Sequence, residues 1–200
     1  HGFRVAILAQ PDWKSVSAWR ALGPPRLFYA VSAGAMDSMV NHYTANRKRR
    51  NADAYSPNGA IAMRPDRANA VYAQRCREAY KGIPVIAGGV EASLRRAAHY
   101  DYWSGKVMPS SLVSSKADLV AYGSGENTLL AITRRLDAGE TVRDLRDLRG
   151  VAYLLGKSGA LPEHVFDDAA CDSQTLSLPS YEEVQASPDA FARATRRLHQ

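Results

Sequence analysis

The stretch PVIAGGVEAS, residues 84–93, passes from an apolar run through two glycines to an acidic residue. A short, continuously apolar run is typical of a strand that is buried on both faces of a parallel sheet. Gly88 and Gly89 allow the backbone to turn sharply, and the residues from about Glu91 onward predict a helix. The stretch therefore predicts one strand-to-helix crossing of an α/β fold.

The same alternation continues in both directions along the chain. Further strands are predicted at 4–10, 26–34 and 117–123, and residues 150–155 predict an edge strand or a hairpin. Helices are predicted at 14–22, 36–50, 66–81, from about 91, and at 127–139, where Gly139 is expected to adopt a left-handed cap. This alternation predicts a doubly wound, mostly parallel sheet of the Rossmann-like or flavodoxin-like α/β class.

The pattern weakens after the edge strand. We expect a domain over residues 1–155, followed over 156–200 by a linker and a first helix of whatever comes next. Residues 161–166 and 178–184 look extended, and 188–199 predict a helix. A core strand beginning almost at His1 and a helix running to Gln200 suggest a piece of a larger protein.

Composition narrows the class of protein. With 46% hydrophobic and 23% charged residues, the chain has a globular rather than a disordered composition. No apolar run reaches the ~20 residues that span a bilayer, and no secretory leader is evident, so we expect no membrane partner and a cytoplasmic location. Cys76 and Cys171 are too far apart for a closely spaced metal-binding pair, and Cys76 is expected to be a buried thiol.

Small and polar residues follow each of the four predicted strands. In parallel sheets, ligands bind beyond the carboxyl ends of the strands, so we expect these residues to form one rim. The candidate rim residues are Gln10, Asp12, Ser32, Gly34, Asp37, Asn41, Gly88, Gly89, Glu91, Gly123, Gly125 and Glu126. Neither glycine loop has the G-x-G-x-x-G spacing of a dinucleotide site.

The segment HYDYW, residues 99–103, has two interpretations. With Glu91, His99 and Asp101 are candidates for acid–base catalysis beside a wall of aromatic rings. Alternatively, the segment is a helix end anchored by its aromatics, and on a helix His99 and Asp101 would not face each other. His42 allows the same two interpretations, and no metal ligand is assigned.

The net charge of +6 is concentrated in the first half of the chain, which includes the basic run Arg47–Arg50. This run is either a solvated helix end, where cations suit the helix dipole, or a contact for phosphate groups or RNA. A short basic run without interleaved aromatics is weak evidence for nucleic-acid binding.

Six segments together resemble the N-terminal domain of YgiQ-type radical SAM proteins. They are AQPDW (9–13), MDSMVNHYTANRKRR (36–50), RPDRANAVYAQRCREA (64–79), GGVEASLRRAAHYDYWSGKV (88–107), KADLVAYGSGE (116–126) and LPSYEEV (178–184). The domain is also similar in architecture to the cobalamin-binding domains that precede many radical SAM barrels, although the D-x-H-x-x-G cobalt-ligand pattern is missing.

The resemblance implies a non-catalytic accessory domain whose partner is its own downstream barrel. It also implies a [4Fe-4S] cluster and S-adenosylmethionine for the full-length protein, but no cofactor within this segment, which lacks the C-x-x-x-C-x-x-C motif. We expect the rim to cover the barrel mouth, with Glu91 and residues 99–103 facing the substrate or the barrel loops. The alternatives are a separate nucleotide- or corrinoid-binding module and an RNA-contacting domain.

Overall fold

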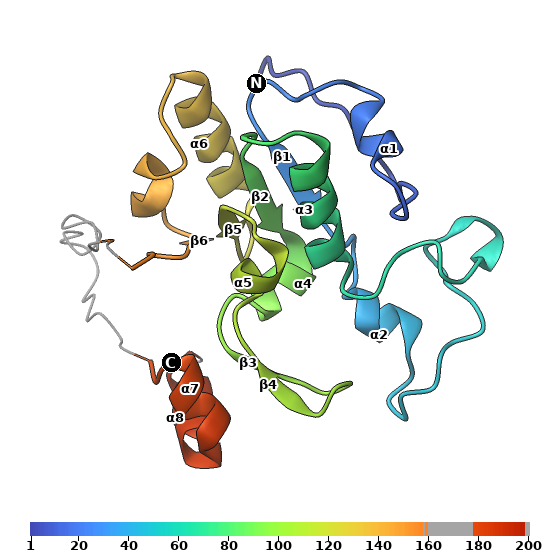
Figure 1. Ribbon diagram of the computed structural model, residues 1–200, viewed down its shortest axis with the longest axis vertical. Coiled ribbons are helices and arrows are strands. Elements are labelled where there is room, and N and C mark those ends of the chain that lie inside the picture. Colours follow the sequence, from blue (N-terminus) through green and yellow to red (C-terminus); the bar gives the residue numbers. More distant parts are fainter. Residues whose placement is uncertain (158, 160–177, 199–200) are drawn as a thin grey trace.

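A four-stranded sheet forms the centre of the computed structural model, which describes residues 1–157, 159 and 178–198 (Figure 1). Strands β1 (Tyr29–Ser32), β2 (Val85–Gly88) and β5 (Leu119–Ala121) are parallel, and β6 (Val151–Ala152) runs antiparallel to β5. The order across the sheet is β1-β2-β5-β6. The predicted α/β class with a mostly parallel sheet is confirmed, as is the edge strand within 150–155.

Helices cover both faces of this sheet. Helices α1 (Ser17–Arg20), α3 (Ala68–Ala79) and α5 (Ser111–Ser115) pack on one face, and α6 (Glu126–Asp137) and the 3-10 helix η2 (Asp144–Asp147) on the other (Figure 1). Alternate residues of each strand face opposite sides, so Val85 and Ala87 pack toward α3 whereas Ile86 packs toward α6. This two-sided burial explains why the strands read as continuous apolar runs.

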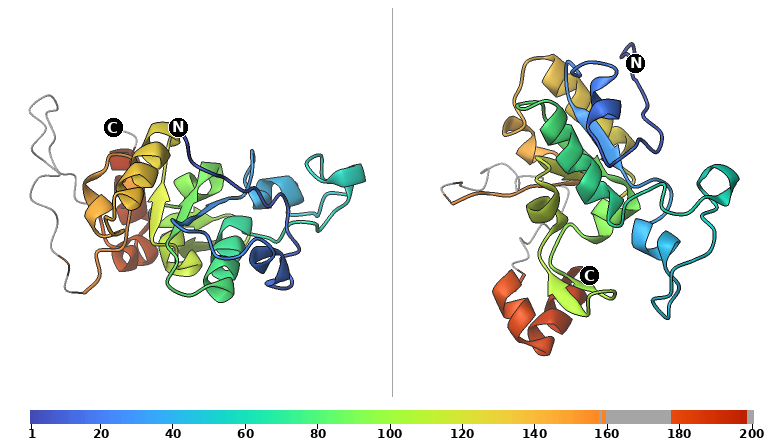
Figure 2. Two further views of the ribbon diagram at one scale, coloured as in Figure 1. Left: turned by 90° about the horizontal axis from the view of Figure 1, so that it is seen from above. Right: turned by 45° about the vertical axis from the view of Figure 1, so that its right-hand side comes forward.

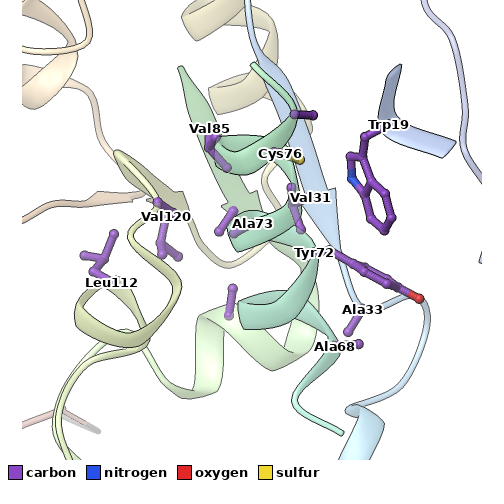
Figure 3. Close-up of a cluster of buried hydrophobic side chains, with 14 residues drawn as sticks. Trp19, Val31, Ala33, Ala68, Tyr72, Ala73, Cys76, Val85, Leu112 and Val120 are labelled. Atoms are coloured by element: carbon purple, nitrogen blue, oxygen red, sulfur yellow. The ribbon is translucent and has the colours of Figure 1, made fainter. Parts of the chain in front are cut away.

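The larger core lies between α3 and the sheet (Figure 3). Trp19 from α1 packs against Tyr72 of α3, with the ring centroids 5.8 Å apart. Cys76 lies beside them and is buried, as predicted, and burial raises the pKa of its thiol to about 12. Gly139, directly after α6, has φ +94° and confirms the predicted left-handed cap.

The strand predicted at 4–10 is wrong. No regular structure forms there, and Val5 and Ile7 are 81% and 84% exposed. Within the described residues, β1 pairs only with β2, and no ladder extends to 4–10. An apolar run suits a strand, but it becomes one only by pairing with a distant segment, and the local sequence does not encode that pairing.

Only residues 38–42 of the helix predicted at 36–50 are helical, and the rest of that prediction is wrong. Helix α2 covers Ser38–His42, and Tyr43 is extended and forms an isolated antiparallel bridge with Arg49. Between them, Arg47 has φ +60°, and Thr44 Oγ1 accepts from Lys48 N at 3.2 Å. This side-chain-to-backbone bond stabilises a turn instead of a helix, because Thr competes for backbone donors. The basic run therefore does not end a helix.

Residues 99–108 form a hairpin, so the predicted helix end is also wrong. Strands β3 (His99–Asp101) and β4 (Lys106–Met108) pair antiparallel, with His99 opposite Met108 and Asp101 opposite Lys106. Gly105, at φ +67°, supplies the left-handed residue of the connecting turn. Residues two apart on a strand lie on the same face, so the argument that separated His99 from Asp101 on a helix does not apply.

The C-terminal residues form two helices, α7 (Tyr181–Ala186) and α8 (Pro188–Leu198). The second confirms the helix predicted at 188–199, whereas the extended structure predicted for 178–184 is wrong from Tyr181 onward. The missed signal is a capping box, in which Ser180 and Glu183 satisfy each other's backbone N–H groups. Helix α7 packs on β4, where the Tyr181 hydroxyl donates to Val107 O at 3.4 Å.

The remaining elements are short. Helix α4 covers Gly89–Leu94, and the loop between α2 and α3 contains the 3-10 helix η1 (Pro57–Gly59). Residues 161–166 and Cys171 lie outside the described residues, and the domain boundary near 155 stays a prediction. Of the helices that the structure describes, none is both long and apolar enough to cross a membrane.

Candidate functional site at the carboxyl edge of the sheet

Three of the four predicted loops meet beyond the carboxyl ends of the parallel strands. A Cβ atom on Gly89 would lie 2.6 Å from Ser32 Oγ, and one on Gly88 would lie 3.4 Å from Ala121 O. The Gly123 N–H donates to Ser93 Oγ at 3.3 Å. These contacts join the ends of β1, β2 and β5, so the rim predicted from Ser32, Gly34, Gly88, Gly89, Gly123 and Gly125 exists as one edge.

The fourth loop does not follow a strand, because 4–10 is not one. Gln10 Nε2 instead donates to Tyr55 O at 2.7 Å and to Ser56 Oγ at 3.2 Å. Asp12 Oδ1 accepts from Lys14 N at 3.1 Å within a local turn. The placement of Gln10 and Asp12 at the end of a core strand is therefore corrected.

Glu91 anchors two helices at this edge. Its Oε2 accepts from Ser38 N at 2.8 Å, at the start of α2, and its Oε1 accepts from Asn69 N at 2.9 Å, at the start of α3. A carboxylate is favoured there because helix N-termini present free N–H groups and positive partial charge. Glu91 is 3% exposed, and each of its oxygens has a backbone donor. Its predicted catalytic role stays a prediction.

Asp37 and Asn69 extend this network. Asp37 caps α2 by accepting from Met39 N at 2.9 Å and Val40 N at 3.3 Å, and it forms a buried ion pair with Arg95. Asn69 Nδ2 donates to Gly88 O at 2.9 Å, which links α3 to the end of β2. These bonds hold α2, α3 and α4 in one fixed arrangement around the rim.

A second buried ion pair lies at the carboxyl end of β1, where Arg64 also contacts Ala33. Arg64 Nη2 is 3.2 Å from both carboxylate oxygens of Asp53, and Arg64 Nη1 donates to Ala33 O at 3.1 Å. Burial acts to raise the pKa of Asp53, but the neighbouring Asn41 amide and hydrogen bonds from Tyr55, Ser56 and Arg64 outweigh it and lower the pKa to about 2. Sequence reasoning missed this pair, because neither residue follows a predicted strand.

His42 and Tyr43 both bind Asp66. His42 Nδ1 lies 2.8 Å from Asp66 Oδ1, and the Tyr43 hydroxyl donates to Asp66 Oδ2 at 2.7 Å. Burial alone would raise the pKa of Asp66. The bonds to Tyr43 and His42 outweigh that effect, so the pKa lies below its ordinary value. The bond to Asp66 raises the pKa of Tyr43. His42 is thus a buried histidine with a carboxylate partner.

His99 and Asp101 have separate partners. Asp101 Oδ2 accepts from Arg67 Nη2 at 2.7 Å and from Ser104 N at 3.0 Å, and these donors lower its pKa against the effect of burial. His99 Nδ1 lies 3.1 Å from Ala97 O, and burial is the main cause that lowers its pKa. Their catalytic roles stay predictions. Of the other candidates, Asn41 is buried in α2 and Glu126 is exposed at the start of α6.

The described residues do not fit an iron–sulfur cluster. A cluster ligand must be a thiolate, whereas Cys76 is buried against Trp19 with its pKa raised to about 12. Within the part of the chain that the structure describes, no three His, Cys, Asp or Glu side chains are grouped to hold a metal ion.

Comparison with known proteins places the chain in a family. A family model described as Radical SAM N-terminal matches residues 1–200. The chain belongs to the radical SAM N-terminal family. It is 51% identical to a UPF0313 protein of Rhodopseudomonas palustris over 207 aligned residues, and 50% identical to one of Geobacter sulfurreducens over 198. It is 42% identical to the UPF0313 protein YgiQ of Salmonella typhimurium over 242 aligned residues.

These alignments cover 99% of the radical SAM N-terminal chain but only 31%, 31% and 34% of the three relatives. The chain thus spans about a third of the length of the curated relatives that it matches. No solved structure matches it. The resemblance to YgiQ-type radical SAM proteins is confirmed, and membership of this family implies an accessory domain of a radical SAM protein.

Proposed function

We propose that this domain packs its carboxyl edge against the catalytic part of a full-length radical SAM enzyme, covers the mouth of that part and helps to position the substrate. The observation that carries the proposal is the exposed apolar surface of α4. Val90 and Leu94, on this short helix at the carboxyl edge, are 48% and 65% exposed. The [4Fe-4S] cluster and S-adenosylmethionine belong, in this proposal, to the two-thirds of the relatives that the chain does not span.

The network beneath α4 supports a positioning role. Glu91 and Arg95 tie α4 to α2 and α3 through hydrogen bonds and an ion pair, while Val90 and Leu94 of α4 remain exposed. A rigid surface loses little conformational entropy when it docks, and covering a radical site excludes water and side reactions. The domain contributes enclosure, and the cofactors supply the chemistry.

Site-specific cross-linking in the full-length protein tests the docking. A photoreactive amino acid replaces Leu94 in one variant and Leu22 in another, because Leu22 follows α1 and is 61% exposed, nearly as much as Leu94. Mass spectrometry of the adducts should show Leu94 linked to peptides beyond this domain, and Leu22 not linked to them. Absence of such links from Leu94 would contradict the proposal.

Oxygen sensitivity tests the covering role. Val90→Glu places a charge in the proposed interface, and Val113→Glu is its matched control on α5, where Val113 is 51% exposed. In the full-length protein we expect Val90→Glu to lose the visible absorbance of the cluster faster in air than the wild type and Val113→Glu. Equal rates in all three proteins would count against a cover at this edge.

A further inference from the structure

A pocket of about 320 Å³ lies between α2, the turn that follows it, and the β3–β4 hairpin. This volume is within the range, roughly 300–1,000 Å³, of small-molecule sites. The turn and the hairpin tip lie side by side (Figure 2, right), where the Tyr102 hydroxyl donates to Ala45 O at 2.6 Å. The lining residues are Met39, Tyr43, Arg47, Arg67, Trp103 and Ser104.

Two guanidinium groups line this pocket. Arg47 is exposed, forms no ion pair among the described residues, and lies over the Tyr102 ring at 4.7 Å. Arg67 donates to Asp101, but its side chain is 41% exposed and a guanidinium carries five N–H donors. Exposed Lys48, Arg49 and Arg50 directly follow Arg47 in the sequence and add three cations next to the pocket lining.

Aromatic rings complete the lining. Trp103 packs edge-on against Tyr102, with their centroids 5.7 Å apart, and Tyr43 lines the pocket with its hydroxyl already bound to Asp66. The Trp103 Nε1 atom is buried and has no hydrogen-bond partner among the described residues. Such a donor usually has a partner in a folded protein.

We propose that this pocket binds a nucleotide unit, with its phosphate on Arg47 and Arg67 and its base against Trp103 and Tyr43. Guanidinium groups suit phosphate, and stacking on aromatic rings is how proteins hold unpaired bases. The unit is either a free nucleotide or part of single-stranded RNA. The basic run contains no aromatic residue, but in the folded protein Tyr102 and Trp103 of the hairpin lie next to Arg47.

The test measures nucleotide binding by the full-length protein. Fluorescence anisotropy follows a labelled single-stranded RNA of about ten nucleotides, within the usual site sizes, between about 50 and 200 mM salt. Calorimetry follows the four nucleoside 5′-monophosphates. RNA affinity should fall steeply as the salt concentration rises, because bound phosphates release counterions.

Two variants remove the proposed contacts, and a third serves as control. Arg47→Ala should lower the salt slope of RNA binding by about 0.7 and weaken affinity severalfold. Trp103→Phe reduces the proposed stacking surface while keeping an aromatic ring, and should weaken binding about fivefold. Lys81→Ala removes another exposed cation, after α3, and should change neither quantity. Melting temperatures verify that all three variants are folded.

The outcomes distinguish an RNA strand from a free nucleotide, and they decide whether the pocket binds either. Binding of RNA much tighter than of monophosphates identifies an RNA strand, and binding of monophosphates alone identifies a free nucleotide; both support the pocket. The proposal is overturned if neither binds, if Arg47→Ala and Trp103→Phe keep wild-type affinity, or if Lys81→Ala weakens binding as much as they do. Cross-links from Leu94 are unaffected by these results, so the docking proposal is tested independently.

Discussion

The Asn69 N–H at the start of α3 donates to Glu91 Oε1 of α4 at 2.9 Å, across 22 residues of sequence. Together with the bond from Ser38 N, it makes one buried carboxylate the common cap of two helices. Glu91, a candidate catalytic acid in the sequence, thus fixes the starts of α2 and α3 at the rim.

Glu91→Gln should destabilise the domain. The amide keeps one acceptor oxygen but turns an N–H₂ group toward a backbone donor, and hydrogen bonds to a charged group contribute about 1.5–3 kcal/mol. We expect the free energy of unfolding to fall by about 2 kcal/mol in urea titrations. Glu126→Gln, at the exposed start of α6, is the control and should change it by less than about 1 kcal/mol. Equal losses in the two variants would refute the capping role.

The Asp53–Arg64 pair should show strong coupling in a double-mutant cycle. Arg64→Met leaves Asp53 as a buried, uncompensated charge, which costs about 3–5 kcal/mol. Asp53→Asn combined with Arg64→Met removes that charge while keeping an acceptor for Tyr55 N. The double variant should therefore be more stable than Arg64→Met alone in the same titrations. If the double variant instead loses, relative to the wild type, the sum of the stability losses of the two single variants, the pair is not coupled.

Stability should fall in acid because of Asp53. Its pKa in the folded protein, about 2, is below the ordinary value of 3.8, so the stability it contributes is present above about pH 4 and lost as pH falls through about 2. The shift corresponds to about 2 kcal/mol. The difference in unfolding free energy between wild type and Asp53→Asn should shrink over this range, since a protonated carboxyl resembles an amide. A constant difference from pH 6 to pH 2 would argue against it.

Gly89→Ala should cost more than the same change at Gly139. Gly89 has φ +76°, and an added Cβ would meet Ser32 Oγ at 2.6 Å, whereas Gly139, at φ +94°, has open space around it. The control reports backbone strain alone, about 1–2 kcal/mol, and Gly89→Ala adds the clash. Thermal unfolding measures both. Adding Ser32→Ala to Gly89→Ala should recover part of the loss; no recovery would mean that the clash is relieved elsewhere.

Short sequence patterns predicted correctly those elements whose formation depends mainly on neighbouring residues. The apolar runs at β2 and β5 predicted their strands, because both faces of the sheet are buried, and Gly139 marked the end of the helix predicted at 127–139. The residues 4–10 carry a similar apolar run but form no strand, because a strand also needs a neighbour. The hairpin at 99–108 was missed because its short alternation, His99-Tyr100-Asp101, was interpreted as part of the preceding helix.

The site divides in the same way. Strand ends and glycines predicted where Ser32, Gly89 and Gly123 meet, because parallel strands bring their carboxyl ends to one edge. Partner choice was not predictable: Arg64 pairs with Asp53 and Arg67 with Asp101, although other carboxylates, such as Asp66, lie closer to both in sequence. Ion pairs between loops depend on how the loops pack, and charge alone does not select among several carboxylates.

By itself, the sequence determined the α/β class, the family and the edge at which polar loops gather, since hydrophobic periodicity and long motifs act locally along the chain. Only the tertiary structure decided that Glu91 caps two helices and that Trp103 of a hairpin lies in one pocket with Arg47, 56 positions earlier. Those contacts arise where segments distant in sequence pack together, and this packing depends on the whole fold and not on any single stretch of sequence.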